Sequence, residues 1–213
     1  MQFPHIIEQF HFGNQTIKLA IPEPAAVQQW YASRMHHNAD TAFPYWAKLW
    51  PSARAICIYL ANHSALLKNK KVLELAAGIG LPSMLASAFA SSVVCSDAAP
   101  AAIPFIEYSA SLNNRNNIEA ALIDWNNIAD MPPADILLLS DVNYEPAQFK
   151  GLLRLLLHYL SNGSAIVLST PQRLMAKPFI EQLLPYCEAK TTIPIKTGLE
   201  TTEIFIMQLQ KQG

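Results

Sequence analysis

Charge, glycine and cysteine are all scarce in this sequence. Its 213 residues include 15 Lys and Arg, 16 Asp and Glu and only 7 Gly. Charged residues make up 15% of the chain, against about 25% in typical soluble domains. With a net charge of −1 and no basic run denser than Lys68–Lys71, nothing indicates electrostatic capture of nucleic acid. A low content of charged residues is compatible with a plain surface or with a self-association surface. A monomer and a weak homo-oligomer are therefore both possible from the sequence.

The three cysteines and the missing apolar runs give an expected location. Cys57, Cys95 and Cys187 are odd in number, far apart and each in an apolar context, which predicts buried free thiols in a reducing compartment. Residues 1–10 lack the basic start and apolar core of a signal peptide. No apolar run reaches about 18 residues, so we expect no membrane span. Together these features predict a cytoplasmic protein.

Hydrophobic residues, at 51%, are numerous enough for one domain with a sizeable core. From residue 72 onward, apolar runs alternate with amphipathic segments, which predicts a parallel sheet with helices on both faces. We expect strands at 72–75, 92–95, 120–123, 135–139, 165–169, 189–195 and 204–209, and helices at 52–62, 81–90, 99–112, 147–160 and 174–186. The last two strands, joined at 196–198, read as an antiparallel pair. The predicted fold class is α/β, a Rossmann-like, doubly wound, mostly parallel seven-stranded sheet with an antiparallel C-terminal strand.

The first 43 residues read as an extension of this domain, which we expect to span residues 44–213. Strand-like segments at 7–12 and 16–21 flank a turn at Gly13, which predicts a hairpin. A helix is expected at 25–35, followed by a polar loop at 36–43. Pro44–Pro51 then form a connector rich in aromatic residues, which is either a rigid lid or part of the core.

Four acids stand at or just beyond the ends of successive predicted strands. They are Glu74, Asp97, Asp124 and Asp141. The carboxyl ends of parallel strands face one crevice, where ligands of open α/β sheets bind. We therefore expect these carboxylates to line a shared site. The alternative is that each acid only caps a helix or a turn.

The turn after the first parallel strand narrows the choice of ligand. Gly78 and Gly80 are present, but the third glycine of a dinucleotide-binding loop is missing and Pro82 removes an amide donor. The ligand therefore lacks a pyrophosphate. S-adenosylmethionine fits better. Carboxylates can accept hydrogen bonds from its ribose hydroxyls and its adenine amine, and their negative charge suits its positive sulfonium. Trp125 can cover a ring face.

The segment Glu74-Leu-Ala76-Ala-Gly78-Ile-Gly80 resembles motif I of the seven-stranded S-adenosylmethionine-dependent methyltransferases. Ala76 replaces the first glycine of that motif, which predicts a backbone outside the left-handed region at this position. Four further segments together resemble the family-16 protein lysine methyltransferases: Leu49-Trp50-Pro51, Glu74 to Pro82, Asp124-Trp125 and Asp141 to Glu145. The resemblance covers about residues 44–145.

This resemblance implies a role for each residue at a matching position. The implied cofactor-binding residues are Trp50, Glu74, Ala76, Ala77, Gly78, Gly80, Leu81, Asp97, Ala98, Asp124, Trp125 and Ser140. Asp141 and Tyr144 are the implied catalytic residues, with Asp141 orienting an acceptor amine. Tyr45, Trp46 and Asn143 would face the substrate. Trp46, Trp50 and Tyr144 have an alternative role as packed aromatic residues.

The function expected from this resemblance is N-methylation of a lysine side chain in a protein substrate, with S-adenosylmethionine as cofactor. Two other classes stay open: a methyltransferase acting on a small molecule or RNA, and a non-catalytic module that docks a partner through the aromatic connector. The chain lacks the Asp-Pro-Pro-Tyr type segment that would hold a base amine. None of its six histidines stands at metal-ligand spacing to a cysteine or a carboxylate, so we expect no metal.

Overall fold

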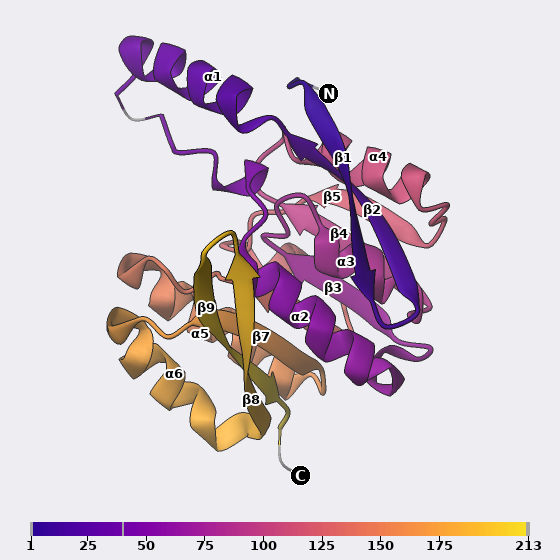
Figure 1. Cartoon of the computed structure of the whole chain (residues 1–213). Coiled ribbons are helices and arrows are strands. Elements are labelled where there is room, and N and C mark those ends of the chain that lie inside the picture. The colour runs from indigo at the N-terminus through magenta and orange to yellow at the C-terminus, as the bar shows by residue number, and fades with distance from the viewer. Residues whose placement is uncertain (1, 40, 212–213) are drawn as a thin grey trace.

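Alternating strands and helices build one seven-stranded sheet in the order β5-β4-β3-β6-β7-β9-β8 (Figure 1). The protein is seen in a computed structural model that describes residues 2–39 and 41–211. The strands are β3 (Lys71–Leu75), β4 (Ser92–Asp97), β5 (Ile118–Leu122), β6 (Ile136–Ser140), β7 (Ala165–Pro171), β8 (Cys187–Thr197) and β9 (Glu200–Leu209). Strands β3 to β7 pair in parallel, whereas β9 runs antiparallel to both β7 and β8. The predicted sheet is confirmed.

Helices cover both faces of the sheet. Helices α2 (Pro51–Asn62), α3 (Leu81–Ala86) and α4 (Ile103–Leu112) lie on one face, and α5 (Phe149–Ser161) and α6 (Lys177–Leu183) on the other. Strand β3 shows why: Val72 packs into the first core cluster, while Leu73 and Leu75 pack into the second. Chain order reverses between β3 and β6, so the ligand edge lies at the C-terminal ends of these neighbouring strands.

The N-terminal segment is a hairpin followed by a helix. Strands β1 (His5–Phe12) and β2 (Gln15–Pro22) pair antiparallel around a turn at Gly13, and α1 (Pro24–His37) projects beyond the sheet in Figure 1. The hairpin is tied to α4, because the Ala20 amide donates to Ser109 Oγ at 3.1 Å. Lys18 N likewise donates to Asn113 Oδ1 at 2.8 Å. The expected hairpin and helix are both present.

Three helices are shorter than predicted, and local chemistry explains each. Helix α3 ends at Ala86 rather than at residue 90, where Ser87 Oγ donates to the Met84 carbonyl and competes with helix bonds. Helix α4 begins at Ile103 rather than at residue 99, because Pro104 suits only a first helical turn. The predicted helix 174–186 is broken, with α6 flanked by 3₁₀ turns at 174–176 and 184–186, where Pro185 lacks the N–H for a further helical bond.

The cysteine prediction holds for two residues of three. All three are free; Cys57 and Cys95 are buried, and burial raises the pKa of both thiols well above its ordinary value, which makes them inert. The predicted burial of Cys187 is wrong, because this residue begins the edge strand β8 and stays partly exposed. Within the described parts of the chain, no helix is long and apolar enough to pass through a bilayer.

Candidate functional site

The turn that follows β3 is held against the end of β4. The amide of Ala77 donates to the Ser96 carbonyl at 2.9 Å, and the amide of Gly78 donates to Asp97 Oδ2 at 2.8 Å. To make these bonds the chain turns sharply, and Ala76 takes a φ of +50°. The expectation that Ala76 avoids the left-handed region is wrong, because the cross-strand bonds fix the turn in spite of its Cβ.

This strained alanine gives a stability prediction. Ala76→Gly is expected to raise the free energy of unfolding by about 0.5–1 kcal/mol, because relief of left-handed strain exceeds the added entropy of an unfolded glycine. Ala76 is exposed, so no packing is lost. Ala77→Gly is the matched control, since Ala77 has no positive φ, and it should lower the free energy by about 0.5–1 kcal/mol. Urea unfolding measures both; equal losses in the two variants would contradict the strain.

Glycine is required at both remaining positions of the turn by close packing. A Cβ on Gly78 would lie 2.8 Å from the Trp46 carbonyl oxygen, and a Cβ on Gly80 would lie 2.6 Å from Cys95 Sγ. Gly80 and Leu81 are buried, so they support the turn from beneath. The predicted cofactor residues that face outward here are Ala76 and Ala98, with Ala77 partly covered.

Glu74 lies beneath this turn and is completely buried. Its Oε2 accepts hydrogen bonds from the Ser83 amide at 2.9 Å and the Ser83 hydroxyl at 2.6 Å, while Oε1 has no partner among the described residues. Burial raises the pKa of Glu74 to about 8, although the two bonds from Ser83 lower it. Glu74 therefore anchors the start of α3 and shapes the turn from below.

The raised pKa of Glu74 predicts a pH-dependent stability. The ordinary pKa is 4.5 and the folded-state pKa is about 8, so the folded protein binds this proton more tightly. Stability from Glu74 is complete below the lower value and is lost as pH rises toward the higher one, by about 1.4 kcal/mol per pH unit at the steepest. Between pH 5 and pH 8, Glu74→Gln should therefore lose less stability than the wild type. Urea unfolding across this range checks this; Glu107→Gln, an exposed glutamate on α4, should track the wild type.

Asp97 ends β4 and joins the turn to the chain that leads to α4. Its Oδ2 accepts from the Gly78 amide, and its Oδ1 accepts from the Ala99 amide at 2.9 Å. Burial raises the pKa of Asp97, and these backbone amides oppose the rise. Each carboxylate oxygen has a second lone pair, so Asp97 can still accept from a ligand hydroxyl.

The predicted adenine side is less well formed. Asp124 is exposed, and its Oδ1 accepts from the Asn126 amide at 3.0 Å and from the Asn126 side chain at 2.7 Å. It therefore caps its own turn beyond β5, which is the alternative that the sequence left open for each acid. Trp125 is partly buried and packs against the core cluster that contains α5.

Asp141 follows β6 and forms an ion pair that the sequence did not predict. Its φ is +59°, its amide donates to the Ser169 carbonyl at 2.8 Å, and its side chain is 7% exposed. Oδ1 accepts from Nη1 of Arg173, which lies just after β7. The pattern of acids at strand ends does not predict Arg173. The signal for it in the sequence is a basic residue two positions beyond the end of β7.

Two polar side chains beside Asp141 are buried without partners. Ser140 Oγ and both amide atoms of Asn143 make no hydrogen bond with any described residue, and Asn143 is 0% exposed. An unsatisfied buried polar group costs about 1–3 kcal/mol. Polarity is therefore retained here at the expense of folding, as expected where a ligand supplies the missing partners.

The aromatic connector is divided between this site and the core. Tyr45 lies 5.4 Å from Tyr144 between ring centroids, and both rings are nearly half exposed, at 47% and 40%. Trp50 Nε1 donates to the Tyr45 carbonyl at 3.0 Å, which fixes the connector. Burial raises the pKa of the Tyr144 hydroxyl. Trp46 instead packs against Phe3 and Phe105 in the core cluster.

The structure thus places Glu74, Asp97, Asp141 and the Tyr45–Tyr144 pair at the C-terminal edge of β3, β4 and β6. Over residues 2–39 and 41–211, no group of three or more His, Cys, Asp or Glu side chains is placed to hold a metal. The edge combines a backbone turn, acidic acceptors, unsatisfied polar atoms and a pair of exposed tyrosines. These groups suit a polar ligand and an acceptor that meet at one place.

Comparison with known sequences decides the family. Residues 34–184 match the family described as lysine methyltransferase. The chain belongs to this family. The histone-arginine methyltransferase METTL23 of Xenopus laevis is 31% identical over 192 residues, which cover 79% of this chain and 82% of that protein. The protein N-lysine methyltransferase METTL21A of Danio rerio is 30% identical over 129 residues, covering 57% and 58% of the two chains.

Solved structures share the fold of this lysine methyltransferase family member. The 16S rRNA methyltransferase RsmC of T. thermophilus, in complex with AdoMet and guanosine, has a TM-score of 0.65 at 13% identity, covering 98% of this chain and 51% of that one. A branched-chain polyamine synthase of Thermus thermophilus has a TM-score of 0.53 at 18% identity, covering 74% and 55%. Since proteins of different activity share the fold, the site residues must carry the functional argument.

Proposed function

We propose that the protein transfers a methyl group from S-adenosylmethionine to the side-chain nitrogen of a lysine in a protein. Family membership and the relatives named as protein methyltransferases support this proposal. The observation that carries it is the unpartnered amide of Asn143 and hydroxyl of Ser140 beside Asp141. In this proposal, the acceptor and the methyl group meet beside these three residues.

The residues at the sheet edge fit the cofactor. Asp97 would accept hydrogen bonds from the ribose hydroxyls, and the partly exposed turn at Ala76–Gly78 would approach the methionine part. The hydroxyl of Ser140 would find its missing partner there. S-adenosylmethionine would supply a methyl group that is already activated by its sulfonium. Because the donor is activated, the protein's main task is to align the acceptor nitrogen with it.

Asp141 and the paired tyrosines would hold the acceptor. A lysine must lose its proton before it can attack; burial favours the neutral amine, whereas a nearby carboxylate favours the charged form. Asp141 therefore acts mainly by orienting the amine. Tyr45 and Tyr144 would contact the aliphatic part of the substrate lysine side chain. The Arg173 guanidinium occupies one Asp141 oxygen, so the acceptor uses the other oxygen or displaces Arg173.

An arginine acceptor is the second candidate. Two observations favour it: Asp141 already binds a guanidinium, and the METTL23 relatives of Xenopus laevis and Homo sapiens, each 31% identical, are named histone-arginine methyltransferases. A site that accepts the Arg173 side chain from within the chain has the charge to accept the same group from a substrate.

Residue-level mass spectrometry tests both acceptors. The protein is incubated with deuterated-methyl S-adenosylmethionine and separate pools of protein, RNA and metabolites, beside an Asp141→Asn variant. Labelled lysine that depends on Asp141 supports the proposal, and labelled arginine favours the second candidate. Label only in RNA or metabolites would overturn both. No label, together with no cofactor binding by calorimetry, would instead indicate a non-catalytic module.

We also propose a cytoplasmic location. The free, buried thiols of Cys57 and Cys95 support it, since cysteines stay reduced in that compartment. Cell fractionation with an antibody to the native protein tests this, and recovery in an extracellular or membrane fraction would contradict it.

A further inference from the structure

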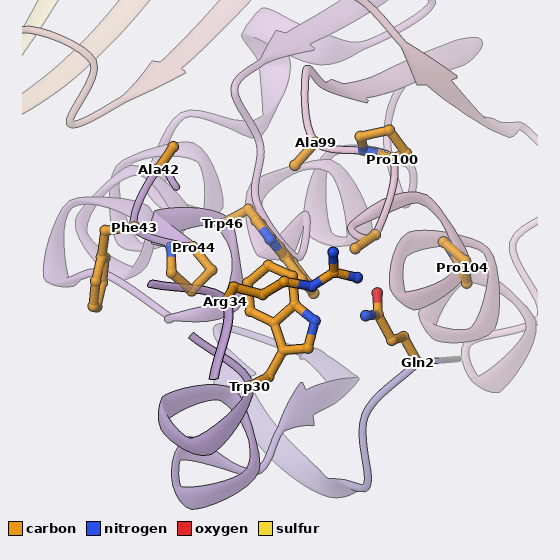
Figure 2. A pocket seen from close by; sticks show the side chains of 11 residues that line it. Gln2, Trp30, Arg34, Ala42, Phe43, Pro44, Trp46, Ala99, Pro100 and Pro104 are labelled. Atoms are coloured by element: carbon orange, nitrogen blue, oxygen red, sulfur yellow. The ribbon is translucent and has the colours of Figure 1, made fainter. Parts of the chain in front are cut away.

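A cavity lies beside the aromatic connector, between α1 and the chain that leads into α4 (Figure 2). Its volume is about 660 Å³, within the range of small-molecule sites. Trp30 and Arg34 come from α1, Pro44 and Trp46 from the connector, and Pro100 and Pro104 from the opposite wall. Asp141, Asn143 and Tyr144 are not part of the lining, so this cavity is distinct from the acceptor site.

The polar groups of this cavity are mostly hydrogen-bond donors. Arg34 lies with its guanidinium carbon 5.8 Å from the Trp30 ring centroid, and Figure 2 shows it reaching across the cavity toward Gln2. Arg34 forms no ion pair with any described residue. Trp30 Nε1 is buried and has no hydrogen-bond partner in the described chain. None of the eleven described lining residues is acidic.

These features together call for an anionic acceptor. A buried indole N–H without a partner costs about 1–3 kcal/mol, and a guanidinium binds a carboxylate through paired, charge-assisted bonds. Apart from Gln2, the other lining residues are aromatic residues, prolines and alanines, which favour a flat apolar group. A bare inorganic anion would leave those residues in contact with water, and a cation would be repelled by Arg34.

We propose that this cavity binds a carboxylate attached to an apolar, ring-sized group. The Arg34 guanidinium binds the carboxylate, the Trp30 indole N–H donates to it after a small side-chain shift, and Trp46, Pro44 and Pro104 contact the ring. Such a group occurs in free aromatic acids and in peptides where an acidic side chain adjoins an aromatic one. The inference does not depend on methyl transfer.

Binding is tested with N-acetyl-phenylalanine and its amide, which differ only by the carboxylate. Titration into ¹⁵N-labelled full-length protein should shift the Trp30 indole resonance for the acid and leave it in place for the amide. Arg34→Gln should weaken binding of the acid about tenfold or more, as expected for loss of a charged hydrogen bond. Arg154→Gln removes the same charge from the exposed face of α5 and should bind like the wild type.

Two further measurements identify the kind of ligand and confirm that it binds in this cavity. Capped Asp-Phe and Asn-Phe dipeptides, which differ in the side-chain carboxylate, report whether a peptide-borne carboxylate is accepted. Stronger binding of Asp-Phe than of N-acetyl-phenylalanine assigns a peptide ligand. Weaker binding of Asp-Phe assigns a free acid. Ala101→Phe, which places a large side chain in the cavity, should abolish binding of the free acid and of the Asp-Phe dipeptide. Equal shifts by acid and amide, or unchanged binding in Arg34→Gln, would overturn the proposal. Because no methyl donor or acceptor is present, this result is independent of the outcome of the methylation assay.

Discussion

Replacing Asp141 by asparagine is expected to lower kcat about 100- to 1,000-fold, the loss typical when a preorganised electrostatic group is removed from a reaction site. Asp141 is 8% exposed, lies beside the unpartnered Ser140 and Asn143, and is the acid proposed to orient the acceptor amine. Asparagine keeps the side-chain shape and tolerates the left-handed backbone, so the fold is retained. Cofactor affinity, measured by calorimetry, should change by less than about threefold, because the loss falls on the acceptor.

Two variants separate this role from general effects of charge. Glu145→Gln removes a carboxylate from the same loop, where Glu145 is exposed and bonds only Gln148 within the described structure, and it should keep nearly full activity. Arg173→Gln frees Asp141 from its ion pair. If Arg173 competes with the acceptor, this variant lowers KM; if Arg173 positions Asp141, it lowers kcat. Full activity in Asp141→Asn would refute the assignment.

The positions of the acids at one edge of the sheet were predictable, because the ends of strands can be recognised in the sequence. Glu74 is the second-last residue of β3, Asp97 is the last residue of β4 and Asp141 directly follows β6, and parallel pairing brings these strand ends to one edge. Strand β3 is buried on both faces, with Val72 in one core cluster and Leu73 and Leu75 in the other, as expected for a continuous apolar run in a parallel sheet. These features depend on local pattern and on a few topological rules.

What the sequence did not predict depends on contacts between distant segments. The positive φ of Ala76 follows from bonds to Ser96 and Asp97 on another strand. Asp141 and Arg173 are 32 residues apart and pair just beyond the ends of two strands, and secondary-structure propensity carries no information about this pair. Trp46 and Tyr45 are neighbours in sequence, yet one packs in the core and the other faces Tyr144. The helix ends at Pro104 and Pro185 were not predicted because the apolar pattern continues past each proline.

The second large effect is expected at Asp97. Asp97→Asn should weaken S-adenosylmethionine binding about 10- to 100-fold, because a hydrogen bond to a charged acceptor contributes about 1.5–3 kcal/mol. The asparagine NH₂ would also face an amide donor, either Gly78 N–H or Ala99 N–H, so the turn itself loses a bond. Asp124→Asn is the matched control: Asp124 is exposed and bonded within its own turn, so the change in affinity should stay below about threefold.

The pH dependence of cofactor binding distinguishes a direct role of Asp97 from a structural one. Burial raises the pKa of Asp97 above its ordinary value of 3.8, so the carboxylate begins to protonate at a higher pH than an exposed aspartate. A protonated acid loses acceptor strength, so wild-type affinity should fall as pH decreases through this raised pKa, while Asp97→Asn shows no such step. If both proteins lose affinity in parallel, the dependence arises elsewhere, for instance at the turn above Glu74. If affinity falls only in the wild type, while the melting temperature of the wild type does not fall over the same pH range, Asp97 contacts the cofactor directly.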